Sequence, residues 1–196
     1  MQKAIGGGAA TASKVCRTRQ RGRRTSRPAA RYNADIVKAP GSRLSVGMSA
    51  PPFHLRTPFG VEVSLTTACL EGPVLVEFIR GTWDPDARRR LAELASAKEA
   101  FRERKVRVLV VSRERTSAAA GYLTDHPSPL TVLIDEDGAT ARSYGVFRRF
   151  SLPVWSVARP SSFLVDRCGF LRYVYVAALP IHAAPVQAIL AATEAA

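Results

Sequence analysis

Residues 74–87 read Val-Leu-Val-Glu-Phe-Ile-Arg-Gly-Thr-Trp-Asp-Pro-Asp-Ala. The first six form a short, mostly apolar run that is typical of a buried parallel strand. Asp84 followed by Pro85 predicts a helix start, because Asp is a favoured N-cap and Pro suits the first helical position. We expect one helix over residues 85–105, with Arg88, Arg89 and Arg90 away from its apolar face. That apolar face comprises Ala87, Leu91, Leu94 and Phe101.

The remaining periodic segments follow in an order that alternates strands and helices. Residues 61–65 alternate as a hairpin arm, and short apolar runs predict two further buried strands. The expected elements are strands at 106–111 and 130–134, helices at 116–125 and 183–195, a helical turn at 139–144, and a hairpin of 161–165 with 170–176. The pattern is that of an α/β protein.

Four motifs occur in one order along the chain. They are Gly47-x-x-Ala50-Pro51-x-Phe53-x-Leu55, Phe78-x-Arg80-Gly81-x-Trp83-x-Pro85, Asp135-x-x-Gly138 with Tyr144-Gly145-Val146, and Pro160-Ser161-Ser162-Phe163-Leu164-Val165-Asp166-x-x-Gly169. Over residues 46–176 the sequence resembles the peroxiredoxin-like (alkyl hydroperoxide reductase/thiol-specific antioxidant, or redoxin) branch of the thioredoxin superfamily. The resemblance implies a thioredoxin fold with a central mixed β-sheet flanked by helices and an N-terminal β-hairpin.

The same resemblance implies thiol peroxidase or disulfide oxidoreductase chemistry, which the turn at residues 83–87 does not support. With Cys at positions 84 and 87 this turn would read Trp-Cys-Pro-x-Cys. The residues present are Trp83, Asp84, Pro85, Asp86 and Ala87. A carboxylate forms neither a sulfenate nor a disulfide, and Ala87 removes the resolving partner as well. We therefore interpret the turn as a degenerate redox site and assign no catalytic residue.

Asp84 has a structural explanation as a helix cap, which contributes about 1 kcal/mol. The alternatives are a general base, an anionic contact for a ligand, or a hard-cation site shared with Asp86. A capping carboxylate is stabilised in its charged form and is therefore a poor base near neutral pH. Two carboxylates without further oxygen ligands make a weak cation site. We expect neither a metal nor a cofactor.

The resemblance also implies a platform opposite the turn. Pro160 matches the cis-proline that presents backbone to an extended substrate in the thioredoxin fold. Arg80 and Arg159 are the arginines expected near the turn, and without a thiolate Arg80 is expected to pair with Asp84. The long segment 146–159 is either a lid, a partner contact or a covered loop.

Three cysteines provide the remaining thiols, at positions 16, 69 and 168, without paired or metal-ligand spacing. Displaced thiol chemistry would have to use Cys69 or Cys168. We instead expect Cys69 to fill the core and Cys168 to lie in an exposed hairpin turn, where it would be the easier of the two to oxidise.

Charge divides the chain at about residue 44. Residues 1–43 carry eleven Lys and Arg against one Asp, a net charge of +10, whereas the rest of the chain carries +3. We interpret 1–44 as a disordered basic tail, an organelle presequence or a mis-assigned start, and 45–196 as the redoxin domain. Such a tail is suited to binding nucleic acid or another anionic surface. The sequence has no run long enough to span a membrane, so we expect a cytoplasmic protein.

Taken together, the residues favour a redox-inactive, thioredoxin-fold binding module that uses a protein or peptide ligand. One alternative is an antioxidant peroxidase with a displaced cysteine, and another is an anion-binding protein that acts through its tail. Peroxiredoxin-like domains often form dimers, so we also consider a homodimer.

Overall fold

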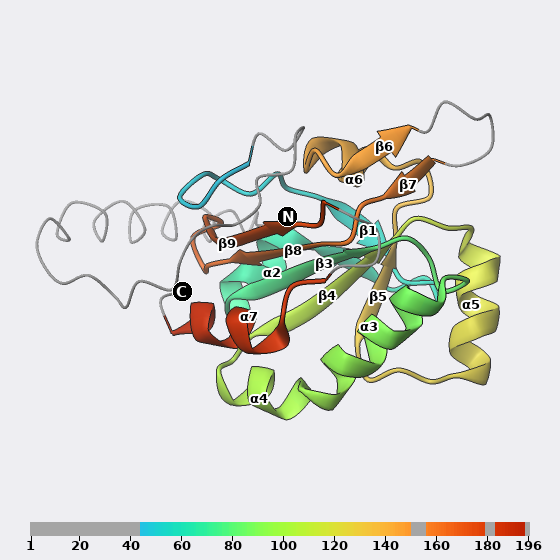
Figure 1. Ribbon diagram of the computed structural model, residues 1–196, viewed down its shortest axis with the longest axis horizontal. Coiled ribbons are helices and arrows are strands. Elements are labelled where there is room, and N and C mark those ends of the chain that lie inside the picture. The colour runs from blue at the N-terminus through green and yellow to red at the C-terminus, as the bar shows by residue number, and fades with distance from the viewer. Residues whose placement is uncertain (1–43, 150–155, 179–182, 195–196) are drawn as a thin grey trace, which may run out of the picture. The chain divides into compact units, whose positions relative to one another are not determined.

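The computed structural model describes residues 44–149, 156–178 and 183–194, and the predicted basic tail lies outside them. Seven strands form one mixed sheet in the order β2-β1-β5-β4-β3-β8-β9 (Figure 1). They are β1 (His54–Arg56), β2 (Glu62–Ser64), β3 (Val74–Ile79), β4 (Arg107–Ser112), β5 (Thr131–Ile134), β8 (Ser161–Val165) and β9 (Leu171–Val176). The predicted thioredoxin fold, with its central mixed sheet and N-terminal hairpin, is confirmed.

Strand β3 lies at the centre of this architecture. It pairs in parallel with β4, where Val76 is opposite Leu109, and antiparallel with β8, where Val76 is opposite Phe163. All six of its residues are buried, as expected for a strand covered on both faces. Its side chains alternate between two cores, with Phe78 in one and Leu75 in the other.

Helices cover both faces of the sheet. One core includes side chains of α3, α4, α5 and α7, and the other includes side chains of α2 and α6. In Figure 1, α3, α4 and α7 lie in front of the sheet. The helices are α2 (Leu65–Glu71), α3 (Pro85–Ser96), α4 (Lys98–Glu103), α5 (Thr116–Asp125), α6 (Ala139–Ser143) and α7 (Val186–Thr193). No helix among the described residues is long and apolar enough to cross a membrane.

The single helix predicted over residues 85–105 is wrong in its extent. It is two helices, because Ala97 leaves the helical region with φ −91° and ψ 6°. After this bend Phe101 packs into the same core as Leu94. The second helix ends before Lys105, whose φ of 56° places it in the left-handed region.

Other elements differ from the sequence expectation more locally. Helix α2 was not expected, and Ser64 is its N-cap. Helix α7 begins at Val186 rather than residue 183, because a proline at 185 disfavours helical backbone at the residue before it. The segment 146–159 contains the antiparallel pair β6 (Phe147–Arg149) and β7 (Ser156–Ala158).

Candidate functional site

The turn between β3 and α3 is fixed by a glycine and a buried glutamate. Gly81 has φ 155°, and a Cβ there would lie 2.2 Å from the Trp83 indole nitrogen. Thr82 donates from its backbone N to Glu114 Oε1 at 2.9 Å and from its hydroxyl to Oε2 at 2.8 Å. Ser112 donates a third hydrogen bond to Glu114 at 2.6 Å. Glu114 therefore anchors the turn to the end of β4.

Asp84 caps helix α3, as expected from the sequence. Its backbone is extended, and its carboxylate accepts from the backbone N of Asp86 at 3.3 Å. Arg80 donates from Nε to the other Asp84 oxygen at 2.7 Å. Asp84 is only 4% exposed, so this carboxylate lies buried between a helix N-terminus and a guanidinium.

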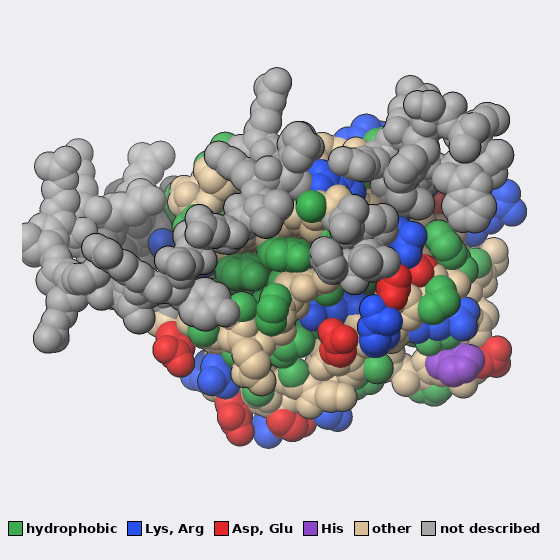
Figure 2. Space-filling view, viewed as in Figure 1, with side chains coloured by type: hydrophobic (Ala, Val, Ile, Leu, Met, Phe, Trp, Pro, Cys, Tyr) green, Lys and Arg blue, Asp and Glu red, His purple; other side chains and the backbone are tan. Residues whose placement is uncertain are grey.

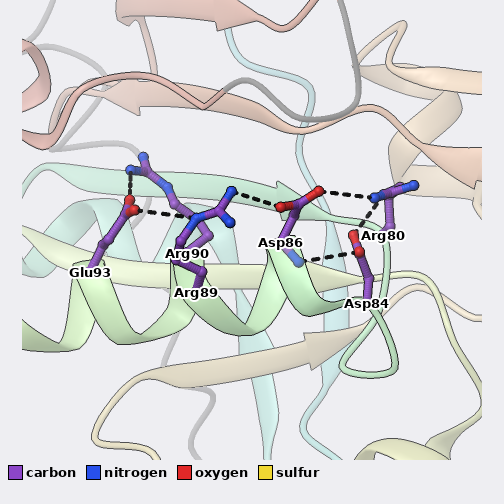
Figure 3. A network of polar contacts seen from close by, with 6 residues as sticks. All are labelled: Arg80, Asp84, Asp86, Arg89, Arg90 and Glu93. Atoms are coloured by element: carbon purple, nitrogen blue, oxygen red, sulfur yellow. Dashed lines mark hydrogen bonds and ion pairs between the residues drawn. The ribbon is translucent and has the colours of Figure 1, made fainter.

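Charged side chains continue from Asp84 along α3 (Figure 3). Arg80 Nη2 lies 3.7 Å from Asp86, and Arg89 donates to Asp86 at 2.7 Å. Arg89 lies 4.0 Å from Glu93, which also accepts from Arg90 at 3.3 Å. Figure 2 shows this alternation of basic and acidic side chains on the same face. We call these six residues the α3 charge ladder.

The ladder ends in a buried ion pair. Arg90 donates from Nε to Glu77 at 2.7 Å, and both side chains are almost fully buried. Burial raises the pKa of the Glu77 carboxyl, and the neighbouring Arg90 charge opposes that effect. The expectation that Arg90 faces away from the core is wrong, because Glu77 on β3 requires a buried cation. The sequence held one signal for this ion pair, which is that Glu77 is the charged residue inside an otherwise apolar strand.

A cleft of about 270 Å³ runs beside the ladder. It brings Pro160 to the same site as Asp84 and Arg80. The described residues that line it are Glu77, Phe78, Ile79, Arg80, Asp84, Asp86, Ala87, Arg89, Arg90, Glu93, Pro160, Ala183, Ala184 and Pro185. Apolar residues and charged residues of both signs therefore line the cleft together.

The remaining residues predicted for the site are Pro160, Arg159 and Trp83, and the structure gives each of them a different setting. The described residues contain no cis peptide bond, so the bond from Arg159 to Pro160 is trans, contrary to the cis-proline expectation. Arg159 is buried and donates from Nε to the Ala177 carbonyl at 3.0 Å. Trp83 is 44% exposed, and the Arg80 guanidinium lies 5.9 Å from its ring centre.

The two candidate thiols do not line the cleft among the described residues. Cys69 lies in α2, is 3% exposed and belongs to the apolar core. Burial, together with the charge of Asp166, raises the pKa of its thiol to about 11. Cys168 lies in the turn between β8 and β9 and is disulfide-bonded. Sequence reasoning did not foresee that bond.

The carboxylates of the turn offer little to a cation. Arg80 pairs with Asp84 and Arg89 pairs with Asp86, so the charge of both carboxylates is already compensated. Within the described ranges, no group of three or more His, Cys, Asp or Glu side chains is arranged to hold a metal ion.

Comparisons with known proteins agree with this fold. The peroxidoxin BcpB of Mycobacterium tuberculosis is 19% identical with a TM-score of 0.69, covering 78% of this chain and 97% of that one. A reduced 2-Cys peroxiredoxin of Plasmodium vivax is 22% identical with a TM-score of 0.66, covering 78% and 81%. AhpC of Mycobacterium tuberculosis is 18% identical with a TM-score of 0.64, covering 78% and 92%.

No curated protein sequence matches the chain. A family match exists nevertheless, and it extends over residues 46–174, from the segment before β1 into β9. It spans more than half of the 196 residues and includes the turn, the cap and Pro160. The chain is therefore a member of the AhpC/TSA family.

Proposed function

We propose that this AhpC/TSA domain is a binding module without thiol peroxidase or disulfide reductase chemistry at its β3–α3 turn. The observation that carries the proposal is the Asp84 carboxylate, which caps α3 and accepts from Arg80 at 2.7 Å. The family resemblance places the attacking thiol at this position. A carboxylate has no sulfur to oxidise, and Ala87 offers no second thiol.

The properties of Cys69 speak against a displaced active site. A nucleophilic cysteine requires a substantial thiolate fraction and access to its substrate. Cys69 is buried, and its pKa of about 11 keeps the thiol protonated at neutral pH. Cys168 is disulfide-bonded and is therefore not a thiol in this state.

The cleft beside Pro160 is the site that we assign to the ligand. Of the apolar lining residues, Pro185 is exposed, whereas Ile79 and Ala87 are almost fully buried. Arg80 and Arg89 pair with Asp84 and Asp86. A protein or peptide segment that carries both apolar and charged side chains matches such a lining. The basic tail remains a separate candidate for anion binding because of its net charge of +10.

The redox part of the proposal is tested by intact-mass analysis of the fully reduced full-length protein after stoichiometric hydrogen peroxide. Peroxide consumption is followed in parallel, with Cys69→Ser and Cys168→Ser variants as controls. We expect slow, scattered oxidation and no turnover. Rapid stoichiometric oxidation that one of these variants abolishes would instead identify a peroxidase with a relocated thiol.

The binding part needs a separate measurement. Three immobilised full-length proteins are compared by the set of proteins that each retains. They are the wild type, Arg89→Glu in the cleft, and Arg115→Glu at the N-cap of α5. Both substitutions change the net charge equally, and both side chains are exposed. We expect the retained set to lose a specific component only with Arg89→Glu. A set that changes equally in both variants, or in neither, contradicts the assignment.

A further inference from the structure

A second charged groove lies at the opposite end of the parallel strands. It has a volume of about 330 Å³ and lies between α4, the start of β4 and the residues before β5. Helix α4 is at the lower edge of Figure 1. Four cations line the groove, and the one acidic residue among its described lining is Glu71. These cations are Lys98, Arg102, Lys105 and Arg107.

Only part of this positive charge is compensated. Arg102 pairs with Glu99 at 2.6 Å, and Arg107 pairs with Glu71 at 3.3 Å. Lys98 and Lys105 are exposed and form no ion pair within the part of the chain that the structure describes. Glu103 also interacts electrostatically with Arg102, so the four cations and three acids leave a local charge of +1. The guanidinium groups also keep donors beyond those in their ion pairs.

Lys105 occupies a backbone position where glycine is the usual residue. Its N–H bonds to the Arg102 carbonyl, and the next N–H, of Val106, bonds to the Phe101 carbonyl, both at 2.9 Å. This pattern is a Schellman motif with Lys105 at C′. Within the described residues, Lys105 is the one non-glycine residue with a positive φ, at 56°. Lysine is the less favourable residue for this backbone, which suggests a role for its ammonium group.

The groove is also built against a second turn. A Cβ on Gly72 would lie 2.4 Å from the Lys105 carbonyl oxygen. The turn after α2 and the turn after α4 therefore touch through backbone atoms, and only glycine allows this approach. The contact fixes the backbone position from which the Lys105 side chain extends.

We propose that this groove binds a compact polyanion of the oligophosphate class. Lysines act as point charges on phosphate, and arginines provide planar forks of donors. A nucleic-acid strand is less suited, because base stacking needs exposed aromatic rings. Phe101 is the only aromatic residue in the described lining, and it is 1% exposed. This site is independent of the cleft at the other end of the sheet.

The test is calorimetric titration of the full-length protein with inorganic tripolyphosphate. Lys98→Gln/Lys105→Gln is compared with Arg115→Gln/Arg167→Gln, which removes the same charge from exposed residues outside the groove. We expect the groove variant to bind at least about tenfold more weakly than the wild type, and the control to change less than about twofold. The basic tail is identical in all three proteins, so any binding by the tail contributes the same separate set of sites to every titration.

Equal losses in both double variants, or no titratable binding by the wild type, would overturn the proposal. A parallel titration with oligo(dT) distinguishes the source of the phosphate. If the oligonucleotide binds more tightly with the same dependence on Lys98 and Lys105, the groove belongs to nucleic acid and the oligophosphate assignment is wrong.

Lys105→Gly provides a second variant in which the fold is expected to persist. We expect an unchanged or higher melting temperature, because glycine relieves the left-handed backbone, together with weaker tripolyphosphate binding. A lower melting temperature with unchanged affinity would show that the lysine is structural and would overturn the inference.

Discussion

The Arg80 guanidinium holds the Asp84 carboxylate at 2.7 Å, at the first turn of helix α3. Asp84 thus receives stabilisation from a neighbouring cation, from the Asp86 backbone N–H and from the helix N-terminus. These three interactions favour a negative charge on whatever side chain stands at position 84. The turn therefore has an electrostatic environment that stabilises an anion, and the anion present is the Asp84 carboxylate rather than a thiolate.

Asp84→Cys should therefore create a thiol with a pKa below the ordinary value of about 8.5. The helix N-terminus and Arg80 stabilise the thiolate as they now stabilise the carboxylate. The measurement is the pH dependence of alkylation by iodoacetamide, made in a Cys69→Ala/Cys168→Ser background with the reactivity of Cys16 subtracted. The matched control, Asp84→Cys with Arg80→Gln, should have a higher pKa. An ordinary or raised pKa in both would show that the turn does not stabilise an anion.

The sequence predicted local features of this site better than contacts between distant segments. Asp84 and Arg80 are four residues apart, and helix-capping preferences identify one of them directly. Strand β3 and helix α5 match their predicted residues because both signals are local: a short apolar run marks the strand, and prolines at 127 and 129 follow the helix. Glu114 was missed because it bonds to Thr82 across 32 residues, which neither periodicity nor capping preferences indicate.

The Glu77–Arg90 pair should show strong coupling in a double-mutant cycle. Glu77→Leu leaves the buried Arg90 with only the exposed Glu93 as a partner, and Arg90→Met leaves the buried Glu77 carboxylate without its cation. Each single substitution should cost about 3–5 kcal/mol of unfolding free energy. The double variant should be more stable than either single one, because neither charge then remains buried. Urea denaturation monitored by circular dichroism provides the measurement. Additive losses in the double variant would mean that water, and not the partner, solvates each charge.

Cys69 should make the protein less stable at alkaline pH. The fold raises its pKa from 9.0 to about 11, so the fold favours the neutral thiol. That stabilisation is complete below pH 9 and is lost as the pH rises through 11. The difference in unfolding free energy between the wild type and Cys69→Ala should change by about 2–3 kcal/mol over this range. Taking the difference cancels the titration of groups that both proteins share.

The Cys69 prediction has a kinetic counterpart. At pH 8 the native thiol should react with iodoacetamide far more slowly than the same thiol in urea, because it is both buried and protonated. Peptide mapping separates its modification from that of the other cysteines. Native and unfolded rates of similar size would contradict the buried, protonated state and would reopen the case for a displaced active site.

Removing the Tyr144 hydroxyl should leave the stability of the protein unchanged or raise it. Its ring contacts Phe78 at 5.0 Å and Phe163 at 4.9 Å between centroids, and the side chain is fully buried. The hydroxyl has no hydrogen-bond partner among the described residues, and burial raises its pKa. An unsatisfied buried hydroxyl costs about 1–3 kcal/mol, so Tyr144→Phe should leave stability unchanged or raise it by about 1 kcal/mol. Tyr144→Leu, which also removes the aromatic ring contacts, should be destabilising and serves as the comparison in thermal unfolding. A loss of more than about 1 kcal/mol in Tyr144→Phe would reveal a buried water that satisfies the hydroxyl.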